Sequence, residues 1–104
     1  MDRYLELLQN ALDAVVGIDV DQRIIFWNYQ AEQTFGWKSG EVLGKDMAMI
    51  IVPEGFRDGH RRGMAHYLET GEGPILNRRI EVPALKKDGT QFSCELTVTV
   101  MKQE

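Results

Sequence analysis

The chain holds few of the residues on which disulfide frameworks, metal clusters and membrane spans depend. Its 104 residues include one cysteine, Cys94, which excludes an internal disulfide and any cysteine-rich metal site. No apolar run approaches the roughly 20 residues that a membrane-spanning helix needs, and no apolar signal-peptide core follows the first residues. We therefore expect a cytoplasmic protein with no membrane contact in this segment.

Basic residues and catalytic motifs are also scarce. Lys and Arg number 12 against 16 Asp and Glu, so the net charge is -4, whereas nucleic-acid binding needs a basic excess. The sequence contains no GxxxxGK(S/T), HExxH, GxSxG or CxxC motif, and no nucleophile–base pair is readable. We expect this domain to bind no nucleic acid and to catalyse no reaction.

The residues that are present suit one small globular domain. Hydrophobic residues make up 43% of the chain and charged residues 27%, which are ordinary values. The predicted order of elements is helix, hairpin, short helices, one longer helix and a second hairpin. This order indicates the α+β class, with an antiparallel sheet, helices on one face and a pocket between the two. We divide the chain into an N-terminal amphipathic helix, residues 1–13, and a domain over residues 14–104.

The N-terminal segment has an apolar stripe. Leu5, Leu8 and Leu12 recur at steps of three and four residues and Tyr4 widens the stripe, which predicts a helix over residues 2–13. The stripe packs against its own domain or against a second copy of the chain, and the pattern permits both. We expect a homodimer, because two-fold symmetry is the usual outcome of self-association. Its candidate interface residues are Tyr4, Leu5, Leu8 and Leu12.

Alternation of apolar and polar residues marks the strands. Extended segments are predicted over residues 15–20, 23–28, 75–85 and 91–101. Asp88 and Gly89 predict the turn of the last hairpin, where Gly89 takes a positive φ. Pro83 is expected to interrupt strand pairing or to mark a bulge. The last segment alternates strictly, so only one of its sides faces a core.

Capping residues mark the short helices. Asn28 is the predicted N-cap of a helix over residues 29–35, which Gly36 ends. Ser39 is predicted to cap the next helix in the same way. The apolar run over residues 47–52 must be buried, either as a helical turn or as an extended piece that lines the core.

Three stretches of the chain together resemble the signature of PAS domains. They read IFWNxxAExxFGW over residues 25–37, EVLGK over residues 41–45 and KDGTxF over residues 87–92. The resemblance covers the chain from about residue 12 to its end. PAS domains are small sensory and interaction modules of signalling proteins. The resemblance therefore implies such a role, and a five-stranded antiparallel sheet in the order 2-1-5-4-3.

One strand of that sheet has no counterpart in the pattern. The family's fifth strand lies at the centre of the sheet, but after Thr90 the sequence offers a single long strand and nothing to pair beyond it. We expect the last strand to be missing from a C-terminally truncated domain. Its absence would leave open edges on the first and fourth strands and favour self-association.

The resemblance also extends to haem-binding oxygen-sensor PAS domains, whose iron-ligating histidine lies on the long helix. His60 occupies that position in the helix predicted over residues 54–70, and Tyr67 matches further along. Ile80 stands where those domains carry a distal arginine, and His66 where they carry a second arginine, so most haem-specific polar contacts are absent. Two interpretations of His60 therefore stay open. It is either the ligand of a haem iron or a half-buried helix histidine with a hydrogen-bond partner.

The predicted pocket draws on this helix and on the strand that follows it. Arg78 shares a side of that strand with Ile80, and would donate to an anion if this side forms the pocket wall, whereas Arg57 and Arg61 are expected on a solvated helix face. A flavin is unsupported, because residues 46–51 lack the reactive-cysteine motif of photosensory relatives and Cys94 points into the core. The candidate pocket residues are His60, Met64, Tyr67, Arg78 and Ile80.

These observations predict a sensory or regulatory PAS domain of a bacterial-type signalling protein. It would bind a small ligand, or relay signals through dimerisation, to an output domain such as a kinase, a cyclase or a transcription factor. A ligand-free dimerisation module and a haem-based gas sensor are the alternatives. The identity of the ligand does not follow from the sequence.

Overall fold

The structure is a computed structural model of the chain and describes residues 3–70 and 79–101, so Arg78 lies outside the described residues. The helices and strands follow one another in the order that the sequence predicts. They are α1 (Arg3–Gln9), β1 (Ala14–Ile18), β2 (Ile24–Trp27), α2 (Tyr29–Phe35), α3 (Ser39–Val42), α4 (Met47–Ile51), the 3-10 helix η1 (Glu54–Phe56), α5 (Arg57–Thr70), β3 (Arg79–Leu85) and β4 (Gln91–Val100).

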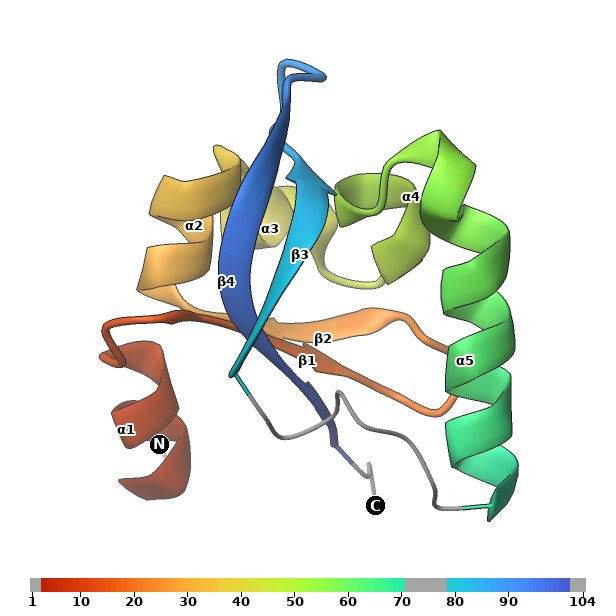
Figure 1. The fold of residues 1–104 in the computed structure, drawn as a ribbon. Coiled ribbons are helices and arrows are strands. Elements are labelled where there is room, and N and C mark those ends of the chain that lie inside the picture. Colours follow the sequence, from red (N-terminus) through yellow and green to blue (C-terminus); the bar gives the residue numbers. More distant parts are fainter. Residues whose placement is uncertain (1–2, 71–78, 102–104) are drawn as a thin grey trace.

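The four described strands form one sheet in the order β2-β1-β4-β3 (Figure 1). β1 pairs antiparallel with β2 and parallel with β4, with Val16 opposite both Trp27 and Val98. The described residues hold four strands and none after β4, as expected from the sequence. The expectation of open edges on the first and fourth strands is wrong, because β4 lies between β1 and β3 and pairs with both. The β1–β4 pairing is parallel, whereas an antiparallel sheet was expected.

Pro83 was expected to interrupt the pairing of the last hairpin or to mark a bulge, but it does neither. The β3–β4 register runs without a shift from Arg79 opposite Thr97 to Leu85 opposite Gln91, and Pro83 faces Ser93 within it. A proline is tolerated there because β3 is the outer member of the described strands and needs no ladder donor on its outer side. The turn is confirmed, since Gly89 has a φ of 88°.

The N-terminal helix is shorter than predicted and ends at Gln9. Leu12 lies beyond it and is 92% exposed, so it does not extend the helical stripe of Leu5 and Leu8. The cause is a distant side chain. The Asn28 amide nitrogen donates to the carbonyls of Leu8 and Asp13, at 2.9 Å each, and this holds the chain where it turns from α1 into β1.

The predicted caps of α2 are confirmed. Asn28 accepts a hydrogen bond from Ala31 N at 2.8 Å, and Gly36 ends the helix with a φ of 83°. The prediction of Ser39 as the N-cap of the next helix is wrong. It is the first residue of α3, and its backbone N–H donates to a carboxylate oxygen of Glu32 at 2.7 Å.

The core lies between the inward face of the sheet and the helices. Val16, Ile18 and Leu96 come from the sheet, and Trp27 packs against Phe35 of α2 with ring centroids 5.2 Å apart. The alternation of β4 is confirmed, because Cys94, Leu96 and Val98 are buried. Figure 1 shows α1 and α2 on one side of β4, and α4 and α5 on the other. The space between α5 and the sheet is where the candidate site lies.

Candidate ligand-binding site

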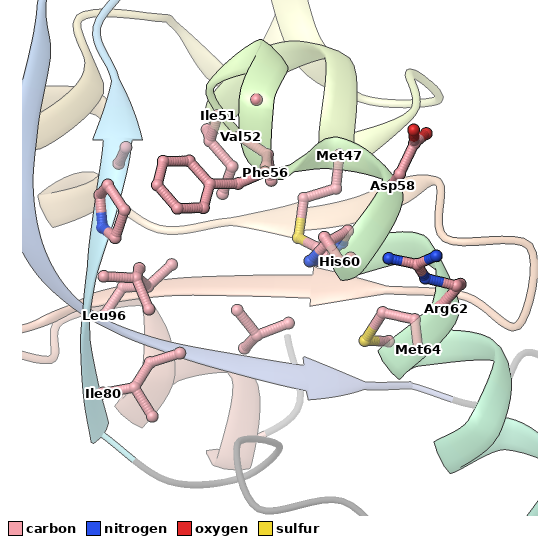
Figure 2. A pocket seen from close by; sticks show the side chains of 16 residues that line it. Met47, Ile51, Val52, Phe56, Asp58, His60, Arg62, Met64, Ile80 and Leu96 are labelled. Atoms are coloured by element: carbon pink, nitrogen blue, oxygen red, sulfur yellow. The ribbon is translucent and has the colours of Figure 1, made fainter.

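A cavity of about 570 Å³ lies between the helices α4 and α5 and the inward face of the sheet (Figure 2). Its sheet wall is built from side chains of β3 and β4, and its helical wall from α4, η1 and α5. Most of the wall is apolar, because alternate residues of each strand face inward. The sheet contributes Ile80, Val82, Ala84, Leu96 and Val98.

Helix α5 forms the long side of the cavity and is weakly embedded in the domain. Of its described side chains only Met64, which is 2% exposed, is fully buried. His60 and Tyr67 are half-buried and lie on the same face, at spacings of four and three residues from Met64. In Figure 2, His60 and Met64 belong to the helical wall of the cavity, and Ile80 and Leu96 to the sheet wall.

The first two turns of α5 are held against α4 by two arginines. Arg57 Nε donates to the carbonyl of Val52, the C-cap of α4, at 2.9 Å, and to the carbonyl of Ala48 at 3.2 Å, which also accepts the backbone N–H of Val52. Arg61 forms an ion pair with Asp46 at 3.1 Å. The expectation of a solvated position is therefore wrong for Arg57, which is half-buried against α4, whereas Arg61 is exposed as expected.

His60 carries the buried polar atom of the cavity wall. Its Nε2 is buried and has no hydrogen-bond partner among the described residues, so the partner expected for a structural helix histidine is not found. Burial lowers the pKa of His60 below its ordinary value of 6.5; Asp46 opposes this effect and Arg61 reinforces it. The imidazole is therefore neutral at pH 7, and a neutral imidazole can hydrogen-bond a ligand or bind a metal through a free nitrogen.

Three of the five candidate pocket residues line the cavity. His60, Met64 and Ile80 lie on its wall, whereas Tyr67 packs against the core outside the cavity lining. Arg78 lies outside the described residues. The sequence reasoning missed Met47 and Ile51 of α4, although their apolar run was expected to be buried.

The other candidate residues fall at separate places. Leu5 and Leu8 are half-buried in α1, Leu12 is exposed beyond it, and Tyr4 lies in α1 but its side chain is outside the description. Cys94 is buried in β4, and burial raises the pKa of its thiol to about 11, so it is not a reactive thiolate at pH 7.

Residues 3–70 and 79–101 contain neither a metal-binding cluster nor a membrane-spanning helix. No three His, Cys, Asp or Glu side chains there gather closely enough to hold a metal ion. No helix in the same ranges has the length and apolar character to cross a membrane.

Comparison with known families identifies the family to which the chain belongs. The model of the PAS fold matches residues 2–103, and the chain belongs to the PAS family. The four-stranded sheet with its flanking helices agrees with this assignment. The fold predicted by the three signature stretches is confirmed.

Relatives of this chain include sensor proteins. An uncharacterized protein of Azorhizobium caulinodans is 40% identical over 92 residues. The oxygen sensor protein DosP of Escherichia coli is 30% identical over 94% of this chain, and the sensor protein FixL of Bradyrhizobium diazoefficiens is 29% identical over 92%. The chain spans only 12% to 19% of the length of these three proteins. The relationship supports a sensory signalling role for the domain.

Two solved structures share the fold. A PAS domain from Colwellia psychrerythraea aligns with a TM-score of 0.71 at 24% identity, covering 89% of this chain and 75% of that one. A PAS domain of an HTR-like protein from Haloarcula marismortui aligns with a TM-score of 0.59 at 22% identity, covering 89% and 72%.

Proposed function

We propose that this domain is the sensory module of a larger signalling protein and binds a small, mainly apolar ligand between α5 and the sheet. The observation that carries the proposal is the cavity, whose volume of about 570 Å³ falls within the range of small-molecule sites. Its wall combines apolar side chains with one buried polar atom, His60 Nε2, and with the exposed charged residues Asp58 and Arg62. This composition suits a ligand that is held by burial of an apolar part and oriented by polar contacts, of which His60 Nε2 offers the buried one.

Native mass spectrometry of protein purified from cells tests this directly. The parent chain is expected to carry a bound mass that is lost on denaturation. Ile80→Trp, which fills the cavity from β3, is expected to lose that mass, whereas Glu81→Trp on the other face of the same strand keeps it. A parent that carries no bound mass, or an Ile80→Trp variant that retains it, would contradict ligand binding in the cavity.

Haem held by His60 is the second candidate, because a specific observation favours it. The Nε2 atom is buried, unpartnered and on the cavity wall, and it belongs to a neutral imidazole, which is the form that ligates iron. Haem would supply an iron centre that binds diatomic gases. The residues fit the iron-ligating role but not polar contact to a gas, since Ile80 of the sheet wall has no donor.

The two histidines of the chain give a matched test of haem binding. Protein expressed with added haem is expected to show a Soret band that His60→Ala abolishes and His66→Ala, at an exposed position of α5, retains. The absence of a Soret band in the parent would exclude haem and leave other small ligands open to the mass measurement.

We further propose that the domain self-associates through its N-terminal segment and relays its signal to an output domain elsewhere in the protein. Leu7 and Leu12 support this, because they are 68% and 92% exposed. Sedimentation of the parent against Leu7→Glu/Leu12→Glu measures it, with a dimer expected for the parent and a monomer for the variant. A monomeric parent at micromolar concentration would favour a domain that signals without self-association.

A further inference from the structure

Glycine recurs at every fourth position along η1 and the start of α5. Gly55, Gly59 and Gly63 are all exposed, and a Cβ atom added at any of them would meet nothing within 4 Å. Their backbones do not need glycine, because the positive-φ glycines of the described chain are at other positions. Glycine inside a helix is unfavourable relative to alanine. Neither backbone conformation nor crowding by the described residues therefore explains glycine here.

The three positions differ in what they border. Gly55 and Gly59 line the cavity, and Gly63 does not. At position 59 the helix presents bare backbone to the cavity, next in sequence to His60 with its buried, unpartnered Nε2. Gly59 shares the cavity lining with Val82 and Pro83 of the sheet, and a Cβ atom at position 59 would meet open space there.

We infer that Gly59 is a specificity-determining residue, which sets the bulk of the ligand that the cavity admits. The inference rests on the proposed ligand-binding function. The ligand class it names is a molecule with a broad apolar face that lies against the α5 backbone at Gly59, and with one polar group within reach of His60. Glycine at position 59 thus leaves room for the ligand, although it makes the helix less stable than alanine would.

Paired substitutions at positions 59 and 63 test the inference with an apolar fluorescent dye, 8-anilinonaphthalene-1-sulfonate, as the probe. Gly59→Ala and Gly63→Ala are both expected to raise the Tm by similar amounts, because both improve helix propensity. Gly59→Leu is expected to weaken dye affinity roughly tenfold or more, since it fills space that the bound molecule needs. Gly63→Leu, which adds the same side chain outside the cavity, is expected to leave dye affinity within about twofold of the parent.

The outcomes separate this inference from the proposed function. Equal dye affinity in Gly59→Leu and Gly63→Leu, with a parent that binds the dye, would overturn the role of Gly59 alone. The proposed function fails differently. If the parent binds no dye, or if Ile80→Trp binds it as well as the parent, ligand binding in the cavity and the role of Gly59 both fall.

Discussion

The α2 and α5 regions, which share one core on the inward face of the sheet, differ in how completely their groups are satisfied. Around α2, Lys87 of the last hairpin donates its backbone N–H to Phe35 O at 2.8 Å, pairs with Glu41 at 2.7 Å and lies 5.1 Å from the Trp37 ring centre. Around α5, the arginine contacts end after two turns, and Met64 is the only described side chain of this helix that is fully buried. Each region has one buried, unpartnered ring nitrogen, on Trp37 and His60, but only His60 borders the cavity.

This contrast separates the part of the domain that holds the fold from the part that can respond. Regions with few buried contacts open more readily than the core, and ligand-binding elements are drawn from them. A ligand in the cavity would supply the contacts that α5 lacks. The α2 region, already closely packed, would change little.

Truncation of one large core side chain in each region should give the largest single effect, at Phe35, and the largest difference between the two regions. Phe35 lies between Trp27 and Phe92, with ring centroids 5.2 and 6.0 Å away, so Phe35→Ala is expected to cost about 4 kcal/mol. Met64 already borders a cavity, so Met64→Ala is expected to cost about 2 kcal/mol, near the lower end of the losses for truncation of a large core side chain to alanine. Urea denaturation measures both, and a larger loss for Met64→Ala would reverse the assignment of the two regions.

Removal of the Asn28 side chain should destabilise the domain by an amount between those of the two core truncations. Its amide joins α1, β1 and α2, because it accepts from Val15 N and Ala31 N and donates to Leu8 O and Asp13 O. Asn28→Ala deletes an N-cap and leaves buried groups unpaired, so a loss of about 3 kcal/mol is expected.

Asn10→Ala is the matched control for Asn28→Ala. It removes an exposed amide that donates only to Glu6 O, and it is expected to cost less than about 0.5 kcal/mol. Similar losses for the two variants would show that Asn28 does not fasten the N-terminal segment.

The smallest effect expected is a pH dependence at the α3–hairpin contact. The hydrogen bond and charge of Lys87, with the Lys38 backbone N–H, hold the pKa of Glu41 below its ordinary value of 4.5. A lowered pKa stabilises the folded state above the ordinary value, and this contribution is lost as the pH falls through the folded-state pKa. Because the pair is exposed, the effect is small and salt-sensitive.

Thermal melts of Glu41→Gln across the acid range measure this contribution. The variant should melt slightly below the parent at pH 7, and the two should converge as the pH falls below 4.5. Glu54→Gln, at an exposed position of η1, serves as the control. A Tm difference that is constant with pH would show that the carboxylate charge of Glu41 does not contribute.

Local sequence patterns predicted most of the elements, and non-local contacts account for the errors. Helix α2 with both caps, the Gly89 turn and the inward face of β4 follow from neighbouring residues. The end of α1 depends on Asn28, and the place of β4 depends on pairing with β1, more than 70 residues away in sequence. Periodicity shows which side of a strand is apolar but not which strand lies beside it.

The site was predicted in the same uneven way. His60 and Ile80 were found through the family resemblance, and Met64 through its spacing from His60. Met47 was missed as a lining residue because an apolar run reads the same whether it packs in a solid core or borders a cavity. The role of Arg57 could not be read either, since its acceptors are carbonyls of another helix.

Hydrogen–deuterium exchange with and without the anilinonaphthalene dye tests the central claim most directly, because it reports on α2 and α5 at once. Amides of α5 beyond Arg61, where the contacts to α4 end, are expected to exchange faster than those of α2 in the free protein. Saturating dye is expected to slow exchange in α5 and leave α2 unchanged. Equal exchange in the two helices, or protection that appears in α2 instead of α5, would contradict a ligand-responsive α5 beside a fixed α2.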